Sequence, residues 1–88
     1  MKGENIFIIQ TDIVCCNKNC SYQIQAFQNK EDAQKYFNKL VKFEKEKREI
    51  KRKDWVIDKD SETSFEAFEY GYYSYNHIVI TLITIKIQ

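Results

Sequence analysis

Three cysteines and one histidine are the side chains best suited to hold a metal ion. Cys15, Cys16 and Cys20 together with His77 would supply the four ligands of a tetrahedral zinc site. However, adjacent cysteines on a strand point to opposite faces, and the sequence contains no Cys-x-x-Cys pair. We therefore predict no metal and no cofactor, with the cysteines packed as small apolar side chains at the end of a hairpin. A local disulfide or a redox role is the alternative.

Catalysis by these or other polar residues is the second chemistry to consider. Cys–His catalysis would need a thiol activated by His77, and nothing in the neighbouring sequence supports that pairing. Residues 54–69 carry six acids without the ligand spacing of a calcium loop. These acids are Asp54, Asp58, Asp60, Glu62, Glu66 and Glu69. We predict that the chain is not an enzyme, that His77 makes a hydrogen bond at a strand entry, and that the acids form a solvated rim.

A basic block precedes the acidic segment. Residues 42–53 hold seven bases and three acids, although the net charge of the whole chain is only +1. On a continued helix some of these bases would line one side and could meet the phosphates of RNA or DNA. The candidates for nucleic-acid binding are Lys45, Lys47, Arg48, Lys51, Arg52 and Lys53. The interleaved glutamates weaken the positive field, so a solvated helix end is the alternative.

An aromatic block offers a different kind of contact. Four tyrosines lie within six positions, which is too dense for all of them to be buried in so small a domain. Tyrosine is enriched in protein-binding hot spots, and it can also stack on nucleobases. Neighbouring acids favour a basic protein surface over bare nucleic acid. The predicted partner-binding residues are Tyr70, Tyr72, Tyr73, Tyr75, Glu66 and Glu69.

The first half of the chain predicts a β-hairpin and a helix. Residues 5–15 are rich in β-branched residues, Asn17-Lys18-Asn19 has turn chemistry, and residues 20–27 alternate with a period of two. This alternation predicts a half-buried strand with Cys20, Tyr22, Ile24 and Ala26 on its apolar face. A helix is expected from about residue 30 to about residue 48, capped by Asn29. Its predicted apolar stripe comprises Ala33, Tyr36, Phe37, Leu40, Val41 and Phe43.

The second half predicts further strands. Residues 54–58 form a short strand followed by a turn at 59–62, and residues 63–75 are ambiguous between strand and irregular structure, with a bend at Gly71. Residues 76–88 give the strongest strand signal, apolar on both faces, which favours a central position or burial by a partner. The predicted fold class is α+β: a single two-layer domain of residues 1–88, an antiparallel sheet with one helix packed on one face, in the order β-β-α-β-(β)-β. One helix leaves the other face of the sheet partly uncovered, unless the aromatic segment or a second molecule covers it.

Composition narrows the class of protein further. The chain has 88 residues, two glycines and no proline, which excludes a multidomain enzyme, a P-loop and a Rossmann unit. No apolar run reaches the roughly 18 residues that span a bilayer. The first residues lack the apolar region of a signal peptide, and an odd number of cysteines fits a reducing compartment, so we expect a cytoplasmic protein without membrane contact.

Two segments resemble a recognisable group of proteins. These are residues 27–37, FQNKEDAQKYF, and residues 65–77, FEAFEYGYYSYNH. Together with the Lys, Asn and Ile bias, they resemble small uncharacterised proteins of phages and mobile elements in AT-rich bacteria. This group includes anti-CRISPR and other anti-defence inhibitors, which work by occupying a host protein. The resemblance therefore implies a non-enzymatic inhibitor or adaptor that binds a bacterial protein or ribonucleoprotein, such as a CRISPR effector.

Two other functions fit the same sequence. A small RNA- or DNA-binding domain would use the basic helix end and stacked tyrosines, and its affinity would fall steeply with salt. A structural homodimer would join two copies through the open sheet face or through the strand at 78–87, and it need not exclude the inhibitor. Neither the partner nor the order of the strands in the sheet follows from the sequence.

Overall fold

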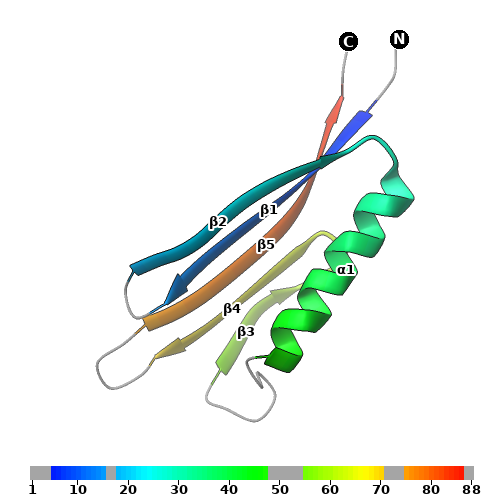
Figure 1. Cartoon of the computed structure of the whole chain (residues 1–88). Helices are drawn as coiled ribbons and strands as arrows, with labels where there is room; N and C mark the ends of the chain where they lie inside the picture. The colour runs from blue at the N-terminus through cyan, green and yellow to red at the C-terminus, as the bar shows by residue number, and fades with distance from the viewer. Residues whose placement is uncertain (1–4, 16–17, 48–54, 71–74, 87–88) are drawn as a thin grey trace.

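The fold is a five-stranded antiparallel sheet with one helix, as seen in a computed structural model of the chain (Figure 1). The structure describes residues 5–15, 18–47, 55–70 and 75–86, and it describes only the backbone of residues 15, 18–20, 70 and 75. The elements in chain order are β1 (Asn5–Cys15), β2 (Lys18–Phe27), α1 (Lys30–Lys47), β3 (Trp55–Asp60), β4 (Ser64–Tyr70) and β5 (Tyr75–Lys86). The predicted α+β class and element order are confirmed.

The strand order in the sheet is β2-β1-β5-β4-β3, which puts the most apolar strand at the centre. β5 pairs with β1 along nearly its whole length and with β4 over residues 75–81. The predicted central position of this strand is confirmed, although α1 covers only one of its two apolar faces. This position means that residues 78–81 have strands on both sides, so this part of the strand cannot pair with a second chain as the homodimer hypothesis allowed.

The helix forms where the sequence predicted and is held at its start by Asn29. The Asn29 side-chain oxygen accepts hydrogen bonds from the backbone N–H groups of Glu31, at 2.8 Å, and Asp32, at 3.3 Å. These bonds satisfy donors that have no partner inside the helix, and both acids lie in the first turn, where the helix dipole favours them. The cap fixes where α1 leaves the end of β2.

The apolar stripe of the helix differs from the prediction at one position. Ala33, Phe37 and Val41 are buried against the sheet, but Phe43 is 56% exposed and the prediction for it is wrong. Glu44 takes the buried place instead, at 5% exposure. At 100° per residue, position 44 lies in phase with 33, 37 and 41, whereas position 43 is turned away from the sheet. Helical phase therefore decides burial here, and not residue type.

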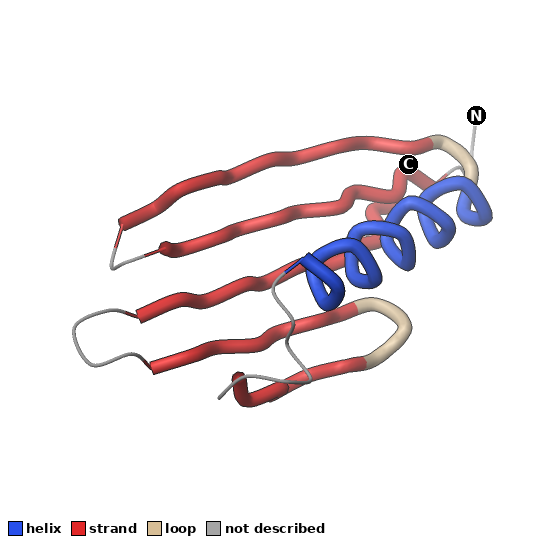
Figure 2. Tube along the Cα trace, turned by 60° about the horizontal axis from the view of Figure 1, so that its bottom comes forward, coloured by secondary structure: helices blue, strands red, loops and turns tan. Residues whose placement is uncertain are grey.

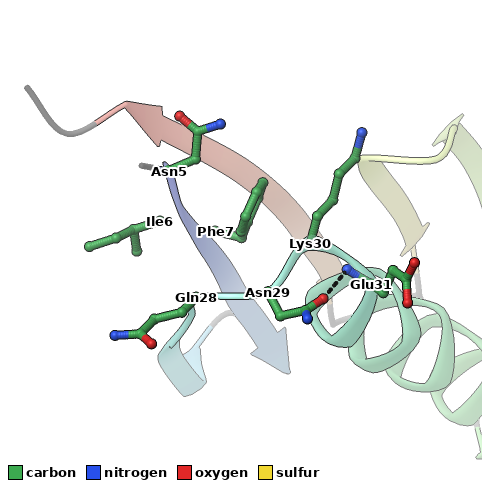
Figure 3. Close-up of a pocket in the computed structure, with 7 residues that line it drawn as sticks. All are labelled: Asn5, Ile6, Phe7, Gln28, Asn29, Lys30 and Glu31. Atoms are coloured by element: carbon green, nitrogen blue, oxygen red, sulfur yellow. Dashed lines mark hydrogen bonds between the residues drawn. The ribbon is translucent and has the colours of Figure 1, made fainter. Parts of the chain in front are cut away.

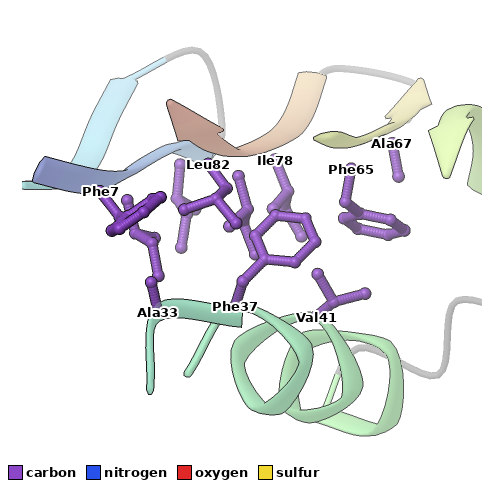
Figure 4. Close-up of a cluster of buried hydrophobic side chains, with 11 residues drawn as sticks. Phe7, Ala33, Phe37, Val41, Phe65, Ala67, Ile78 and Leu82 are labelled. Carbon is purple, nitrogen blue, oxygen red and sulfur yellow. The ribbon is translucent and has the colours of Figure 1, made fainter. Parts of the chain in front are cut away.

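The hydrophobic core lies between α1 and one face of the sheet (Figure 4). Phe37 and Val41 point from the helix toward the strands, and Ile78 and Phe65 point from the strands toward the helix. We call this side of the sheet the helix-side face. Its buried strand residues are Phe7, Ile9, Thr11, Ile13, Phe65, Ala67, Ile78, Ile80 and Leu82.

The first hairpin differs from the prediction in its turn and in what its second strand buries. Lys18 and Asn19 belong to β2, opposite Cys15 and Val14, so the predicted turn is shorter. The register shifts between Ile13 and Val14, which leaves one extra residue in β2 at Cys20. Tyr22, Ile24 and Ala26 do share one face, but they are exposed, so the predicted half-burial is wrong. β2 is an edge strand, and its apolar side faces away from the helix.

The aromatic segment is partly a regular strand. Residues 64–70 form β4, which pairs with both β3 and β5. β3 extends to Asp60, so the turn between β3 and β4 is shorter than predicted. This turn is closed by a hydrogen bond from the Ser61 N–H to the Ser64 carbonyl at 2.8 Å. As β4 is part of the sheet, it does not cover the sheet face opposite the helix. The predicted bend at Gly71 lies outside the described residues.

The molecule is more extended than a typical domain of its size. Its radius of gyration is 14.5 Å and its extents are 52 × 22 × 17 Å, whereas about 12 Å is usual for this length. Its accessible surface is 6494 Å², against about 5,500 Å² for a compact monomer of this mass. Figure 2 shows that the single helix overlies only part of the long strands.

Candidate interaction surface

The sheet face opposite the helix is apolar although no described element lies over it. We call it the open face. Register and alternation assign eleven apolar residues to it: Ile6, Ile8, Val14, Tyr22, Ile24, Ala26, Val56, Phe68, Val79, Ile83 and Ile85. Tyr22 and Ile24 are each 56% exposed, Val56 is 51% exposed, and most of the others are half-buried only by their neighbours in the sheet. Large contiguous apolar patches are unusual on monomeric proteins and mark interaction sites.

The open face has two apolar ends and a polar belt between them. At one end, Ile6 pairs with Ile85 and Ile8 pairs with Ile83. Across the middle of the sheet run Gln10, Thr81 and Ser64, and the next row holds Asp12, Glu66 and Lys59, with Val79 between Asp12 and Glu66. At the other end, Val14, Phe68 and Val56 flank His77. An apolar surface crossed by a few polar groups resembles the make-up of protein-binding patches, in which polar contacts give orientation.

Two predicted site residues, Glu66 and Glu69, lie on opposite faces of β4. Glu66 faces the open side, and its carboxylate is 3.3 Å from the His77 Nε2. Glu69 faces the helix side and accepts a hydrogen bond from the Asn76 side-chain amide at 3.0 Å. Both glutamates are partly buried, so they are not members of one solvated rim as the sequence suggested. The contact with Glu66 agrees with the predicted hydrogen-bonding role of His77.

Two of the predicted tyrosines, Tyr70 and Tyr75, lie at the end of the β4–β5 hairpin. Tyr70 and Tyr75 are opposite each other in the backbone register, as the last and first residues of the two strands. Tyr72 and Tyr73 lie outside the described residues. Because successive residues of a strand alternate between its two faces, positions 70 and 75 belong to the same face of the sheet as Glu66, Phe68 and His77. The backbone therefore extends the open face to the hairpin end.

Of the predicted nucleic-acid-binding residues, the structure describes Lys45 and Lys47. The Lys45 ammonium is 2.9 Å from an Asp60 carboxylate oxygen and 5.3 Å from the centre of the Phe65 ring. The Lys47 ammonium lies 5.6 Å from the centre of the Phe43 ring. Lys45 thus ties the end of α1 to β3, and part of its charge is neutralised. Arg48, Lys51, Arg52 and Lys53 lie outside the described residues.

Asp12 stands out in the polar belt. It lies between Tyr22 and Val79 in the register, and its Oδ1 atom is inaccessible to solvent without a hydrogen-bond partner in the described part of the chain. Leaving a carboxylate oxygen unsatisfied costs stability, on the order of 1–3 kcal/mol. No local sequence signal indicates this burial, because it arises from the cross-strand neighbours of Asp12.

A pocket lies where β2 leads into α1 (Figure 3). It is lined by Phe7 of β1 and by the residues around the helix start, Gln28 to Glu31. A helix start can bind anions through free N–H groups, but here Asn29 accepts the hydrogen bonds of residues 31 and 32, and two acidic side chains stand beside them. The cap and the acidic side chains therefore disfavour an anion in this pocket.

Metal binding and membrane insertion find no support in the described residues. There, no three His, Cys, Asp or Glu side chains gather closely enough to hold an ion. Cys16 lies outside the description, and Cys15 and Cys20 are placed by their backbone alone, in β1 and β2. The helix found between residues 30 and 47 lacks the length and apolar character needed to cross a bilayer.

Comparison with known proteins gives no relative for this chain. No protein-family model matches it, and neither the curated proteins nor the solved structures contain a significant match. The function must therefore be argued from the geometry of the open face.

Proposed function

We propose that the chain is a non-enzymatic binding protein that attaches to a protein partner through the open face of its sheet. The observation that carries the proposal is the exposure of aliphatic and aromatic residues along this face, from Ile85 at one end to Val56 at the other. Burial of apolar surface drives most protein association, at about 25 cal/mol per Å² of area removed from water. A partner that covers the open face would supply the second layer that the sheet lacks on this side.

The size of the face suits a protein partner. Five strands about 4.8 Å apart span roughly 24 Å, and six residues along the strands extend about 20 Å, which gives a face of roughly 500 Å². With its rim, such a face approaches the roughly 800 Å² that each partner contributes to a standard interface.

We propose a bacterial effector protein or ribonucleoprotein as the partner, on the strength of the resemblance to anti-defence inhibitors. The half-buried pair of Glu66 and His77 lies on the open face and would give a partner polar contacts. The tyrosine-rich end of the β4–β5 hairpin would extend the contact beyond the sheet. Tight occupation of an effector requires no chemistry from the inhibitor, only a surface of adequate area and shape.

Capture from bacterial lysate tests this proposal when it is combined with two neighbouring substitutions in β3. Val56 and Ile57 are adjacent and similarly exposed, at 51% and 41%, but Val56 lies on the open face and Ile57 on the helix side. Tagged wild type, Val56→Lys and Ile57→Lys are each used to capture proteins, with and without nuclease, and the eluates are read by mass spectrometry and RNA sequencing.

The proposal predicts a stoichiometric protein that survives nuclease, is retained by Ile57→Lys and is lost with Val56→Lys. A lysine at position 56, at one end of the apolar contact, would leave a buried charge without a partner, which weakens binding by a factor of ten or more. Equal capture by both variants would contradict the assignment of the open face. Recovery of nucleic acid alone, lost on nuclease treatment, would instead support the basic helix end.

A further inference from the structure

The two edges of the sheet differ in how they are protected against pairing with another chain. β2 is an edge over ten residues, and no described strand pairs with its outer side. The sequence has no charged residue from Asn19 through Asn29, and the strand contains no proline or glycine. Edge strands are normally guarded by charges, proline, short length or bulges. β2 has only Lys18 at its first position and the bulge at Cys20, which leave residues 21–27 uncharged and in regular register with β1.

The opposite edge carries the guards that β2 lacks. β3 has six residues, three of which are charged: Asp58, Lys59 and Asp60. Its register with β4 shifts between Ile57 and Lys59, which breaks the regular edge. The stretch of β5 that β4 does not reach is short and ends at Lys86. One long edge is therefore open to pairing and the other is closed.

We propose that two copies of the chain pair through their β2 edges, antiparallel to each other, to form a closed dimer with one continuous sheet. Such a pair is self-complementary about a two-fold axis perpendicular to the sheet. Because β3 is guarded, the assembly stops at two copies and does not grow into a filament. The dimer has ten strands, five from each copy, with both helices on one side and both open faces on the other.

The side chains of β2 favour one register for this pairing. Opposite residues of an antiparallel pair share a face, so residues of the helix-side row must meet each other and residues of the open-face row must do the same. With Ile24 opposite Ile24 of the second copy, Tyr22 meets Ala26 and Gln23 meets Gln25. Within residues 22–26, apolar groups then face apolar groups and amides face amides, and no like charges meet because residues 19–29 carry no charge.

This inference is independent of the proposed function and uses different residues for its test. Gln23 and Gln25 lie opposite Thr11 and Ile9, on the helix-side face, and both are exposed. Substituting them leaves the open face unchanged. A dimer would place two open faces side by side, but binding of a partner to each face does not require it.

Charge substitutions at these two positions test both the edge and the register. Self-association is measured by analytical ultracentrifugation up to about 1 mM protein, for wild type, Gln23→Lys/Gln25→Lys, Gln23→Glu/Gln25→Glu and Gln23→Lys/Gln25→Glu. In the proposed register the first two variants put like charges opposite each other twice, and the third puts opposite charges there twice. Asn38→Lys/Thr63→Lys, at exposed positions away from β2, is the matched control for net charge. Circular dichroism confirms that each variant folds.

We expect a wild-type dimer, association roughly ten- to thirtyfold weaker in the Lys/Lys and Glu/Glu variants, and a dimer restored when these two are mixed. The Lys/Glu variant and the control should dimerise like wild type. A monomer at every concentration, a growing filament, or a dimer indifferent to the Lys/Lys substitutions would overturn the proposal. Loss of the dimer in the Lys/Glu variant would overturn the Ile24 register.

Discussion

The two faces of the sheet carry similar apolar residues, but the helix buries only one of them. β1 presents Phe7, Ile9 and Ile13 to the helix, and Ile6, Ile8 and Val14 to the open face. β5 likewise places isoleucines on both sides. What separates the faces is α1, whose 18 residues extend about 27 Å and can cover only one of them. Apolar alternation in a strand therefore marks what can be buried, and the elements available decide what is buried within the chain.

The largest expected effect is the loss of stability on truncating a side chain of the helix-side face, compared with the open face. Phe65 is fully buried on the helix-side face, so Phe65→Ala should lower the free energy of unfolding by about 3–5 kcal/mol. Tyr22→Ala on the open face removes a side chain of similar size that is 56% exposed, and should cost less than about 1 kcal/mol. Urea unfolding followed by circular dichroism measures both. Equal losses would mean that the open face is part of the core of the free protein.

Loss of the helix cap should lower the free energy of unfolding by less than Phe65→Ala does. Asn29→Ala removes the acceptor for the N–H groups of Glu31 and Asp32, which typically costs about 1 kcal/mol. Asn29→Asp keeps an acceptor at this position and is the matched control. Thermal unfolding compares the three proteins. A cap of no consequence would leave alanine and aspartate variants with the same melting temperature.

Substitution of Asp12 should raise the free energy of unfolding, whereas the substitutions above lower it. Asp12→Thr removes a carboxylate oxygen that is buried without a hydrogen-bond partner in the described residues, and places a β-branched residue in a central strand. We expect a gain of about 1 kcal/mol in the free energy of unfolding, measured in urea. The same variant should bind the partner less well if the belt contributes polar contacts. A loss of stability would show that Asp12 supports the folded chain.

The smallest effect is expected at the end of the helix. Lys45→Gln removes the ion pair with Asp60 and the contact with the Phe65 ring, and partly exposed pairs of this kind contribute about 0–1 kcal/mol. The difference from wild type should shrink as salt is added, because salt screens the wild-type pair. Asp60→Asn should behave alike, and the double variant should lose no more than either single one. Additive losses would contradict a direct pairing of the two side chains.

Much of the fold follows from local sequence signals, whereas the site depends on long-range placement. Asn29, the acids behind it and the strand character of residues 76–88 are sufficient to predict the helix start and the central strand. Residue type alone predicts Phe43 in the core, although its helical phase turns it away from the sheet. Alternation predicts that Tyr22 and Ile24 are half-buried, because it shows that the two faces of a strand differ without showing which one the helix covers. Glu66 and Glu69 are close in sequence, yet strand geometry separates them.

Side-chain labelling of the free and bound protein tests the central claim most directly. Hydroxyl-radical footprinting reports the accessibility of Tyr22, Ile24, Val56 and Ile85 on the open face, and of Phe43 and Ile57 elsewhere. All six should be labelled in the free protein. In the complex with the captured partner, we predict strong protection of the four open-face residues and unchanged labelling of Phe43 and Ile57. Protection of Phe43 or Ile57 with the open face still labelled would contradict the account.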